Sequence, residues 1–183
     1  MLGPRIVGNN EVSLEPGTAA DFRIFDRLQQ EPEVRRFWGP RFGDYGDAAA
    51  EARFLRNARN ADGVTWSIHY RSEAVGFTGI FHIDWVSRDA ETGMFIGRAD
   101  LYGRGIAGEV VRLRTEFARR DLRLRRLHNW IALPNRGSRR ANEKAGYREM
   151  GRFEGAWVRS GEAVAEWLGE ILLEPVDKPL SAP

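Results

Sequence analysis

The chain has 183 residues, with 28 lysines and arginines against 26 aspartates and glutamates, and it contains no cysteine. This length suits a single domain over residues 1–183, which would bury roughly 70% of the surface of the unfolded chain. The absence of cysteine excludes disulfides, thiolate metal sites and a cysteine nucleophile. No apolar run reaches the ~18 residues of a membrane span or resembles the core of a signal peptide, so we expect a cytoplasmic protein.

The first third of the chain has the pattern of one short strand followed by helices. Val12 and Leu14 alternate with polar residues, which predicts a strand. Thr18 and Asp21 have the spacing of a capping box and predict a helix start. Asp47 is expected to cap a later helix. The expected helical segments are 18–30, 33–38 and 47–61, with a loop at 39–46.

From residue 64 onward the hydrophobic period changes to two, which is typical of strands. Three such strands in succession predict an antiparallel meander. A helix and a strand then complete a parallel βαβ crossover, and a second helix ends at Gly146. A hairpin turns at Ser160-Gly161 and leaves a loose tail at 175–183. The expected strands are 64–70, 74–86, 90–96, 127–133, 147–159 and 162–173, and the expected helices are 105–121 and 138–145.

The most informative segment is Leu101-Tyr102-Gly103-Arg104-Gly105-Ile106-Ala107-Gly108-Glu109. A glycine-rich turn at a helix start leaves several backbone N–H groups pointing at one place, with the positive end of the helix dipole behind them. Such an arrangement binds a phosphate or a pyrophosphate. The segment therefore predicts a phosphorylated ligand.

One alternative for this loop is a nicotinamide dinucleotide. Gly103, Gly105 and Gly108 match G-x-G-x-x-G, but that fingerprint also needs an acidic residue about 20 positions later to hold the ribose. The chain reads Arg123-Leu124-Arg125-Arg126 there, and the following strand ends in Pro134-Asn135. The glycine pattern alone is weak support for a nicotinamide cofactor.

Three segments in this order resemble the GNAT superfamily of acyl-CoA-dependent N-acetyltransferases. Residues 102–107 match its [QR]-x-x-G-x-[GA] loop except that Tyr102 stands at the first position. Residues 90–96 resemble its fourth strand, and residues 134–147 resemble its late N-x-x-S…E-K-x-G-[FY] segment. The likeness covers roughly residues 10–174 and is closest to the branch with the Rim-type, polyamine and some aminoglycoside acetyltransferases. It implies a mixed α/β fold, a twisted and mostly antiparallel sheet of about six or seven strands with one parallel crossover and flanking helices.

The resemblance implies acetyl-CoA as the cosubstrate. Its pyrophosphate would lie on the glycine loop, and its pantetheine arm along the strand that follows residue 90. A backbone N–H near Phe95 is expected to hold the oxyanion of the tetrahedral intermediate. The residues expected to contact acetyl-CoA are Met94, Phe95, Ile96, Tyr102, Gly103, Arg104, Gly105, Ile106, Ala107, Gly108, Asn135, Ser138 and Arg140.

The transfer of acetyl to an amine needs a general base and an acid or hydrogen-bond donor for the leaving thiolate. Glu91 matches the fourth-strand glutamate that serves as base in part of the superfamily; otherwise it is a surface carboxylate. Many relatives carry a tyrosine that can act as the general acid where this chain has Asn142, and an amide cannot donate a proton as a phenol can. Ser138 matches a serine proposed to serve the thiolate in Rim-type relatives, or it caps the helix that it begins.

The acceptor side of the site is less marked. His82, Asp84 and Trp85 belong to a strand that flanks the expected cleft, with His82 and Asp84 on one face by strand parity. Trp38 lies beside a loop, with Phe42 and Tyr45, that commonly covers the acceptor in this fold. These side chains either bind the substrate or pack over the sheet. No histidine has metal-ligand spacing, so no metal is expected.

The leading hypothesis is an N-acetyltransferase in which a primary amine attacks acetyl-CoA directly in a ternary complex. The acceptor would be a protein N-terminus, a polyamine, an amino acid or an amine-bearing antibiotic. Asn142 and Trp157 motivate a second hypothesis, a non-catalytic acyl-CoA sensor. Seven arginines between residues 112 and 126 motivate a third, nucleic-acid binding, although such runs are usually solvated helix faces. A homodimer is possible, and no membrane partner is expected.

Overall fold

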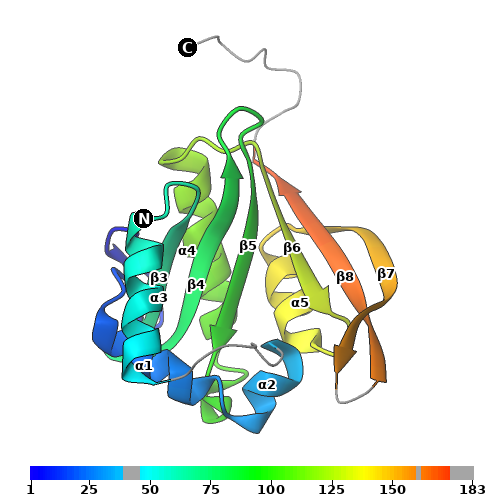
Figure 1. Cartoon of the computed structure of the whole chain (residues 1–183). Coiled ribbons are helices and arrows are strands. Elements are labelled where there is room, and N and C mark those ends of the chain that lie inside the picture. Colours follow the sequence, from blue (N-terminus) through cyan, green and yellow to red (C-terminus); the bar gives the residue numbers. More distant parts are fainter. Residues whose placement is uncertain (39–45, 160–161, 174–183) are drawn as a thin grey trace.

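The computed structural model describes residues 1–38, 46–159 and 162–173 and contains an eight-stranded sheet with helices on both faces (Figure 1). The strand order is β1-β2-β3-β4-β5-β6-β8-β7, and β5 with β6 is the parallel pair in an otherwise antiparallel sheet. The mixed α/β architecture is therefore confirmed, with more strands than expected because the N-terminal strand β1 joins the edge. The strands are β1 (Ile6–Val7), β2 (Val12–Glu15), β3 (Val64–Tyr70), β4 (Glu73–Asp84), β5 (Asp89–Ile96), β6 (Arg126–Ala132), β7 (Arg148–Arg159) and β8 (Glu162–Leu172).

The helices begin and end close to the expected positions. The Thr18–Asp21 capping box is present at the start of the first helix, as its spacing predicted. The expectation that Asp47 caps the third helix is wrong: Gly46 is the cap, with φ of 113°, a backbone conformation that favours glycine. The helices are α1 (Ala19–Leu28), α2 (Pro32–Trp38), α3 (Asp47–Arg59), α4 (Ile106–Arg120) and α5 (Arg136–Lys144), with a short 3₁₀ turn at Ala99–Leu101.

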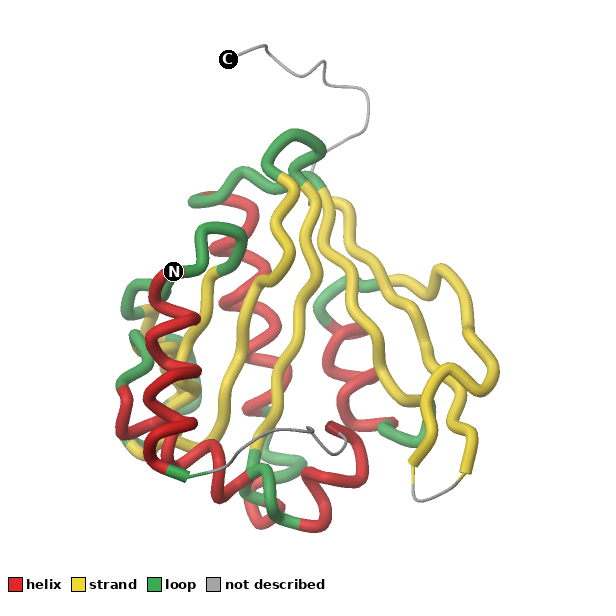
Figure 2. The backbone as a smooth tube through the Cα atoms, viewed as in Figure 1, coloured by secondary structure: helices red, strands yellow, loops and turns green. Residues whose placement is uncertain are grey.

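The two faces of the sheet bury different cores. Helices α1 and α3 lie in front of the sheet on the side of β3 and β4, and α4 and α5 lie behind it (Figures 1 and 2). On the α1 side four phenylalanines pack edge to face or in stacks: Phe22, Phe25, Phe77 and Phe95. The other core contains Trp66, Val110, Leu127 and Trp167 and extends behind most of the sheet.

Strand β4 departs from simple alternation near its end. Its pairing with β5 shifts between Phe81 and Asp84, and His82 there has φ of 51°. The extra residue of this bulge breaks the two-residue period, so strand parity by itself does not determine the faces of His82 and Asp84. The strand ends at Asp84, not at residue 86 as expected, and residues 85–88 form the turn to β5.

The parallel pair of β5 and β6 is short. Their register covers Asp89–Arg126, Ala90–Leu127 and Glu91–His128, after which no pairing continues between them. Strand β5 runs on to Ile96 beside β4, whereas β6 runs on to Ala132 beside β8. The sheet therefore divides into two halves beyond Glu91, and Figure 1 shows the two strands diverging toward the lower edge.

Candidate functional site

A small pocket occupies the opening between the diverging strands. It has a volume of about 70 Å³, and β5 lines one wall through Thr92, Gly93 and Met94. The opposite wall comes from β6 and α5 and includes Ser138 and Asn142. Residues that are far apart in the sequence meet here because the strands separate at Glu91.

The wall formed by β5 offers unpaired backbone groups. The Gly97 N–H donates to the Val75 carbonyl at 2.8 Å. Because hydrogen-bonded and non-bonded pairs alternate in an antiparallel ladder, Phe95 belongs to a bonded pair with Phe77. The N–H groups that face the opening are therefore those of Met94 and Ile96, on either side of Phe95. The Ile96 carbonyl points the same way, since it accepts a hydrogen bond from the Tyr102 hydroxyl at 3.1 Å.

The glycine loop leads into α4 as the sequence predicted. Gly103 and Gly105 have φ of 80° and 82°, and Gly105 is the residue that caps the helix. Among the described residues no group accepts a hydrogen bond from the N–H of Gly103, Gly105, Ile106, Ala107 or Gly108. No atom lies within 4 Å of the place where a Cβ would stand at any of the three glycines. Open N–H groups, free space and the helix dipole together fit a pyrophosphate.

The polar side chains of the loop have modest roles of their own. The exposed Arg104 reaches back to the Asp100 carbonyl at 3.4 Å, and Arg140 is exposed on α5. Tyr102 is half-exposed, and desolvation by burial is the main cause that raises the pKa of its hydroxyl. Neither arginine forms an ion pair with a described carboxylate, although the charge of Arg104 contributes to lowering the pKa of Asp100, so both can meet a phosphate.

Glu91 lies where the two strands part. It is half-buried, pairs in register with Phe81 on one side and His128 on the other, and belongs to the last residue pair of the parallel ladder. Its carboxylate makes no hydrogen bond or ion pair with another described residue. By strand alternation it lies on the face of Phe95, which is the α1 side of the sheet. His128 beside it lies 3.5 Å from the carboxylate of Asp89.

Helix α5 begins earlier than expected and is capped by a different residue. The Ser138 N–H donates to Asn135 Oδ1 at 3.1 Å, so Asn135 is the cap and α5 starts at Arg136. Ser138 lies inside the first turn, and the alternative that it merely caps the helix is wrong. The Ser138 hydroxyl therefore does not cap the helix, and Ser138 lines the pocket.

Asn142 is committed to two strong hydrogen bonds. It is 2% exposed; its Nδ2 donates to the Ser138 carbonyl at 2.9 Å, and its Oδ1 accepts from Asn129 Nδ2 at 2.6 Å. Asn129 Oδ1 in turn has no donor among the described residues. The amide of Asn142 therefore supplies no acidic proton to the pocket. The nearby Tyr147 hydroxyl is buried and lies 3.3 Å from Thr92 Oγ1.

Sequence reasoning missed Arg114, which lines the same pocket from α4. Its side chain is 1% exposed, and Nη1 donates to Thr78 Oγ1 and to the Gly93 carbonyl, at 3.0 Å each. The signal was present in the sequence. Arg114 stands four residues after Val110 and four before Ala118, both fully buried, so it interrupts the apolar stripe of α4.

The residues expected on the acceptor side do not gather at the pocket. His82 is exposed at the bulge, and Trp85 is 45% exposed in the turn after β4. The Asp84 carboxylate accepts from the N–H groups of Val86 and Ser87, and these hydrogen bonds, with the one from the Ser87 hydroxyl first, lower its pKa. The Asp84 side chain therefore stabilises the turn between β4 and β5. Trp38 ends α2, its side chain is not described, and Phe42 and Tyr45 lie outside the described residues.

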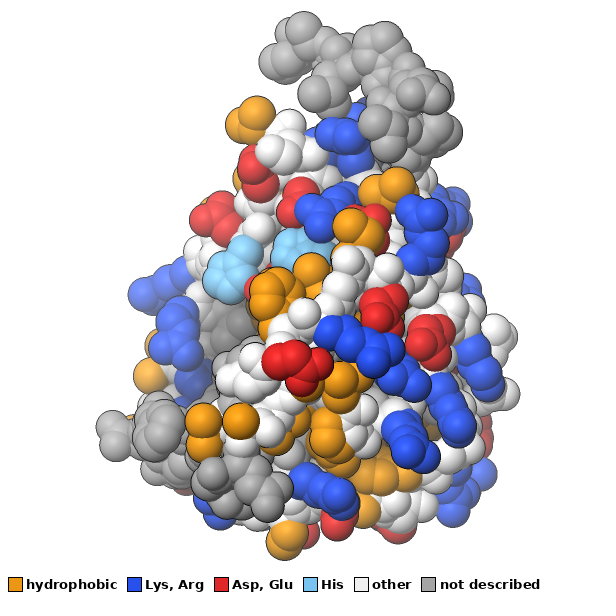
Figure 3. Space-filling model, turned by 90° about the vertical axis from the view of Figure 1, so that its right-hand side faces the viewer, with side chains coloured by type: hydrophobic (Ala, Val, Ile, Leu, Met, Phe, Trp, Pro, Cys, Tyr) orange, Lys and Arg blue, Asp and Glu red, His pale blue; other side chains and the backbone are white. Residues whose placement is uncertain are grey.

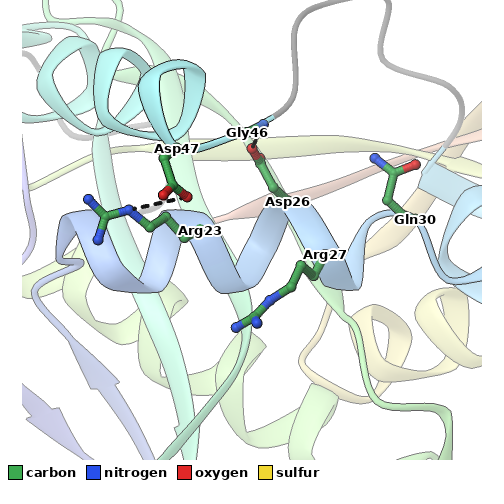
Figure 4. Close-up of a pocket in the computed structure, with 6 residues that line it drawn as sticks. All are labelled: Arg23, Asp26, Arg27, Gln30, Gly46 and Asp47. Carbon is green, nitrogen blue, oxygen red and sulfur yellow. Dashed lines mark hydrogen bonds and ion pairs between the residues drawn. The ribbon is translucent and has the colours of Figure 1, made fainter.

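A second hollow, of about 490 Å³, lies between α1 and the start of α3 (Figure 4). Both carboxylates that line it are paired with arginines. Arg23 lies 3.6 Å from Asp47, and Asp26 pairs with Arg53 and accepts a hydrogen bond from the Gly46 N–H at 3.3 Å. No residue proposed from the sequence lines this hollow.

The arginine cluster does not form one basic face. Arg114 points inward, and ion pairs balance other members: Arg112 with Glu109, Arg119 and Arg120 with Glu116, and Arg126 with Glu170. Figure 3, which looks from the side of β7 and β8, likewise shows basic and acidic side chains intermingled. In the described ranges no three His, Asp or Glu side chains gather as a metal site, and no helix is long and apolar enough to cross a membrane.

Comparison with known proteins agrees with this geometry. A spermidine N-acetyltransferase from Vibrio cholerae, solved with CoA and spermine, superposes with a TM-score of 0.81 at 16% identity over 90% of this chain and 97% of the other. Mycobacterium smegmatis RimJ, solved with CoA-disulfide, gives 0.80 at 20% identity over 96% and 88%. The Vibrio cholerae enzyme has also been described as a dodecamer. No curated protein matches by sequence.

The family model of the acetyltransferase (GNAT) domain matches residues 11–148, which is most of the chain and includes β5, the glycine loop and α5. The chain therefore belongs to the GNAT acetyltransferases, the family of N-acetyltransferases that use acetyl-CoA.

Proposed function

We propose that the protein transfers acetyl from acetyl-CoA to a primary amine by direct attack in a ternary complex. The observation that carries the proposal is the position of the five unbonded N–H groups of residues 103–108 beside the opening between β5 and β6. The unbonded N–H groups suit a pyrophosphate, and the opening between the two strands suits an extended arm that enters the sheet. The chain has no cysteine to carry an acyl-enzyme.

In this proposal the backbone binds most of the cosubstrate. The N–H groups of the glycine loop hold the pyrophosphate, with Arg104 and Arg140 as additional charges. The backbone groups of Met94 and Ile96 that face the opening hydrogen-bond the pantetheine arm. One of these two N–H groups stabilises the oxyanion, since a preorganised donor strengthens its bond as charge develops.

Glu91 is proposed as the general base. An amine attacks only when it is neutral, and a carboxylate with no competing cation is free to accept its proton directly or through a water. Glu91 meets this requirement because no described residue forms an ion pair with it. Its position at the branch point puts it at the inner end of the opening, and Gly93 next to it on the same face leaves room for an amine.

Ser138 is proposed to hydrogen-bond the departing sulfur. Its hydroxyl is released from capping by Asn135, and it lines the pocket together with Asn142. Asn142 stands at the position where many relatives carry tyrosine. Its amide hydrogen-bonds the Ser138 carbonyl and the Asn129 side chain. A serine hydroxyl donates a hydrogen bond but is a poor acid, so Ser138 orients the sulfur more than it protonates it.

The acceptor is proposed to be a small or peptide amine. The two named neighbours are a spermidine acetyltransferase and RimJ, which favours a polyamine or a protein N-terminus over other amines. Amino acids and amine-bearing antibiotics complete the set to be tested.

The experiment combines a thermal-shift titration with a thiol-release assay. Acetyl-CoA at ~100 times its dissociation constant is expected to add about 2.7 kcal/mol to stability, while NAD and NADP produce no shift. A panel of amines then identifies the acceptor by release of CoA. A shift with NAD and none with acetyl-CoA would exclude the proposal.

The alternative of an acyl-CoA sensor is favoured by one observation, the inert amide of Asn142. Glu91→Gln separates the two functions. An enzyme with Glu91 as base loses about 10²–10⁴-fold in kcat and retains its acetyl-CoA affinity. The matched control is Glu51→Gln on the exposed side of α3, which is expected to retain full activity. Wild-type protein that binds acetyl-CoA and acetylates no amine of the panel would support the sensor.

A further inference from the structure

The guanidinium of Arg114 is a buried cation without a carboxylate. It is 1% exposed, Nη1 donates to two neutral acceptors, Thr78 Oγ1 and the Gly93 carbonyl, and the guanidinium also interacts with the Tyr147 hydroxyl. Its Nε has no partner among the described residues. Burial lowers the pKa of the guanidinium, yet arginine stays protonated in proteins. A full positive charge is therefore held inside the molecule by neutral groups.

In the part of the chain that the structure describes, no carboxylate forms an ion pair with Arg114. The titratable side chain that interacts with Arg114 is Tyr147, a hydrogen-bonding hydroxyl and not a carboxylate. On α5, Glu143 is paired with Arg139 at 3.3 Å, and on α4 Glu109 is paired with Arg112 at 2.7 Å. Glu91 lies on the opposite face of β5 from Thr92 and Met94, which face α4. An uncompensated buried charge is costly, and an anion that enters the site removes part of that cost.

Arg114 borders the opening in which the proposed reaction takes place. It lines the same pocket of about 70 Å³ as Gly93, Ser138 and Asn142. In acetyl transfer the amine nitrogen forms a bond to the carbonyl carbon, the C–S bond breaks, and the electron pair of that bond goes to sulfur. The proton lost by the nitrogen goes to the general base. Because Asn142 offers no acidic proton, the sulfur leaves as an anion in need of a positive neighbour.

We propose that Arg114 is the counter-charge for the CoA thiolate, in place of a general acid. The inference rests on the proposed function, since it requires that CoA occupy the opening between β5 and β6. Ser138 then donates a hydrogen bond to the sulfur, and Arg114 stabilises its charge through the low-dielectric interior. The departing thiolate is stabilised without being protonated.

The direct test is the pKa of the CoA thiol in its complex with the protein. Because the chain has no cysteine, the ultraviolet absorption of a thiolate in this complex comes from CoA alone. The bound thiol is expected to titrate at least about one pH unit below free CoA, whose thiol resembles a free cysteine at about 8.5. A bound thiol that titrates at or above the free value would overturn the proposal with no mutation needed. Failure of CoA to bind would instead refute the proposed function.

Substitution separates the charge from the packing. Arg114→Met retains the length of the side chain and removes its charge, so the bound thiol should return to the free pKa or above it, and kcat should fall about 10²-fold. Arg114→Lys should recover part of both effects. Arg119→Met, an exposed arginine of the same helix, should change neither.

Two results would contradict the assignment to sulfur. The first is an Arg114→Met protein that folds, binds CoA and leaves the thiol pKa at the wild-type value. The second is a wild-type enzyme that prefers an acyl-CoA with a free carboxylate and loses that preference in Arg114→Met while the thiol pKa stays unchanged. That outcome would assign the cation to the acyl chain.

Discussion

Helices α3 and α4 both begin after a glycine with positive φ, yet their N-termini are completed in different ways. At α3 the chain supplies its own anions: Asp26 accepts from the Gly46 N–H, and Asp47 stands in the first turn (Figure 4). At α4 no described carboxylate accepts from residues 103–108, and the first-turn acid Glu109 bonds the Asn9 N–H instead. A helix start that the protein completes itself is structural, and one left open is available to a ligand.

Substituting the two capping glycines by alanine should give the largest contrast. Gly105→Ala has to adopt φ near 82° and puts a methyl group into the phosphate space. It is expected to cost about 1–2 kcal/mol of unfolding free energy and to weaken acetyl-CoA binding about 100-fold. Gly46→Ala should cost about 1–3 kcal/mol and leave the affinity unchanged. Chemical denaturation measures the free energy of unfolding, and calorimetric titration measures the acetyl-CoA affinity. Equal affinities for the two variants would contradict the assignment of the α4 helix start to a ligand.

Removing the internal anion of α3 should affect stability alone. Asp26 is 6% exposed and bonds Arg53 and Gly46, so Asp26→Asn loses an ion pair and weakens the helix start. The expected loss is about 2 kcal/mol in the free energy of unfolding, with unchanged acetyl-CoA affinity. Urea denaturation with a parallel binding titration checks it. A change in affinity as large as the change in stability would show that the two helix starts are coupled.

Substitution of Glu109, the first-turn acid of α4, should have the smallest effect on the free energy of unfolding, and that effect should depend on pH. The hydrogen bond from Arg112 is the main cause that lowers the pKa of Glu109 in the folded protein. A depressed folded pKa means that Glu109 stabilises the fold above its unfolded pKa, about 4.3, and that this contribution disappears as pH falls through the folded pKa. The wild type should exceed Glu109→Gln by about 1 kcal/mol near pH 7 and lose that advantage in acid. A constant difference down to pH ~3 would exclude this linkage.

Local features of the sequence predicted much of the fold. The Thr18–Asp21 capping box, the helix start at Gly105 and the parallel crossover from β5 to β6 all agree with expectation. Each depends on residues close in sequence or on a repeating period. Asp47 failed as a cap because glycine at the preceding position adopts a conformation that the rule for polar caps does not consider.

The candidate site was predicted in part. The glycine loop is a contiguous backbone motif, and its open N–H groups follow from its composition. Asn135, and not Ser138, caps α5, because a two-residue difference in helix start is beyond the resolution of sequence patterns. For His82 and Asp84 a bulge that inserts one residue into the strand removes the basis of the parity argument, and neither residue lines the pocket.

By itself the sequence determined the glycine loop at the start of α4, the order of elements and the absence of a thiol nucleophile, because these depend on residue identity and short-range spacing. Only the tertiary structure decided where β5 and β6 separate, which N–H groups face the opening, and that Arg114 lies buried beside Ser138 and Asn142. These features arise from packing between segments distant in the chain, where strand register and helix orientation are set by the whole core and not by any one segment.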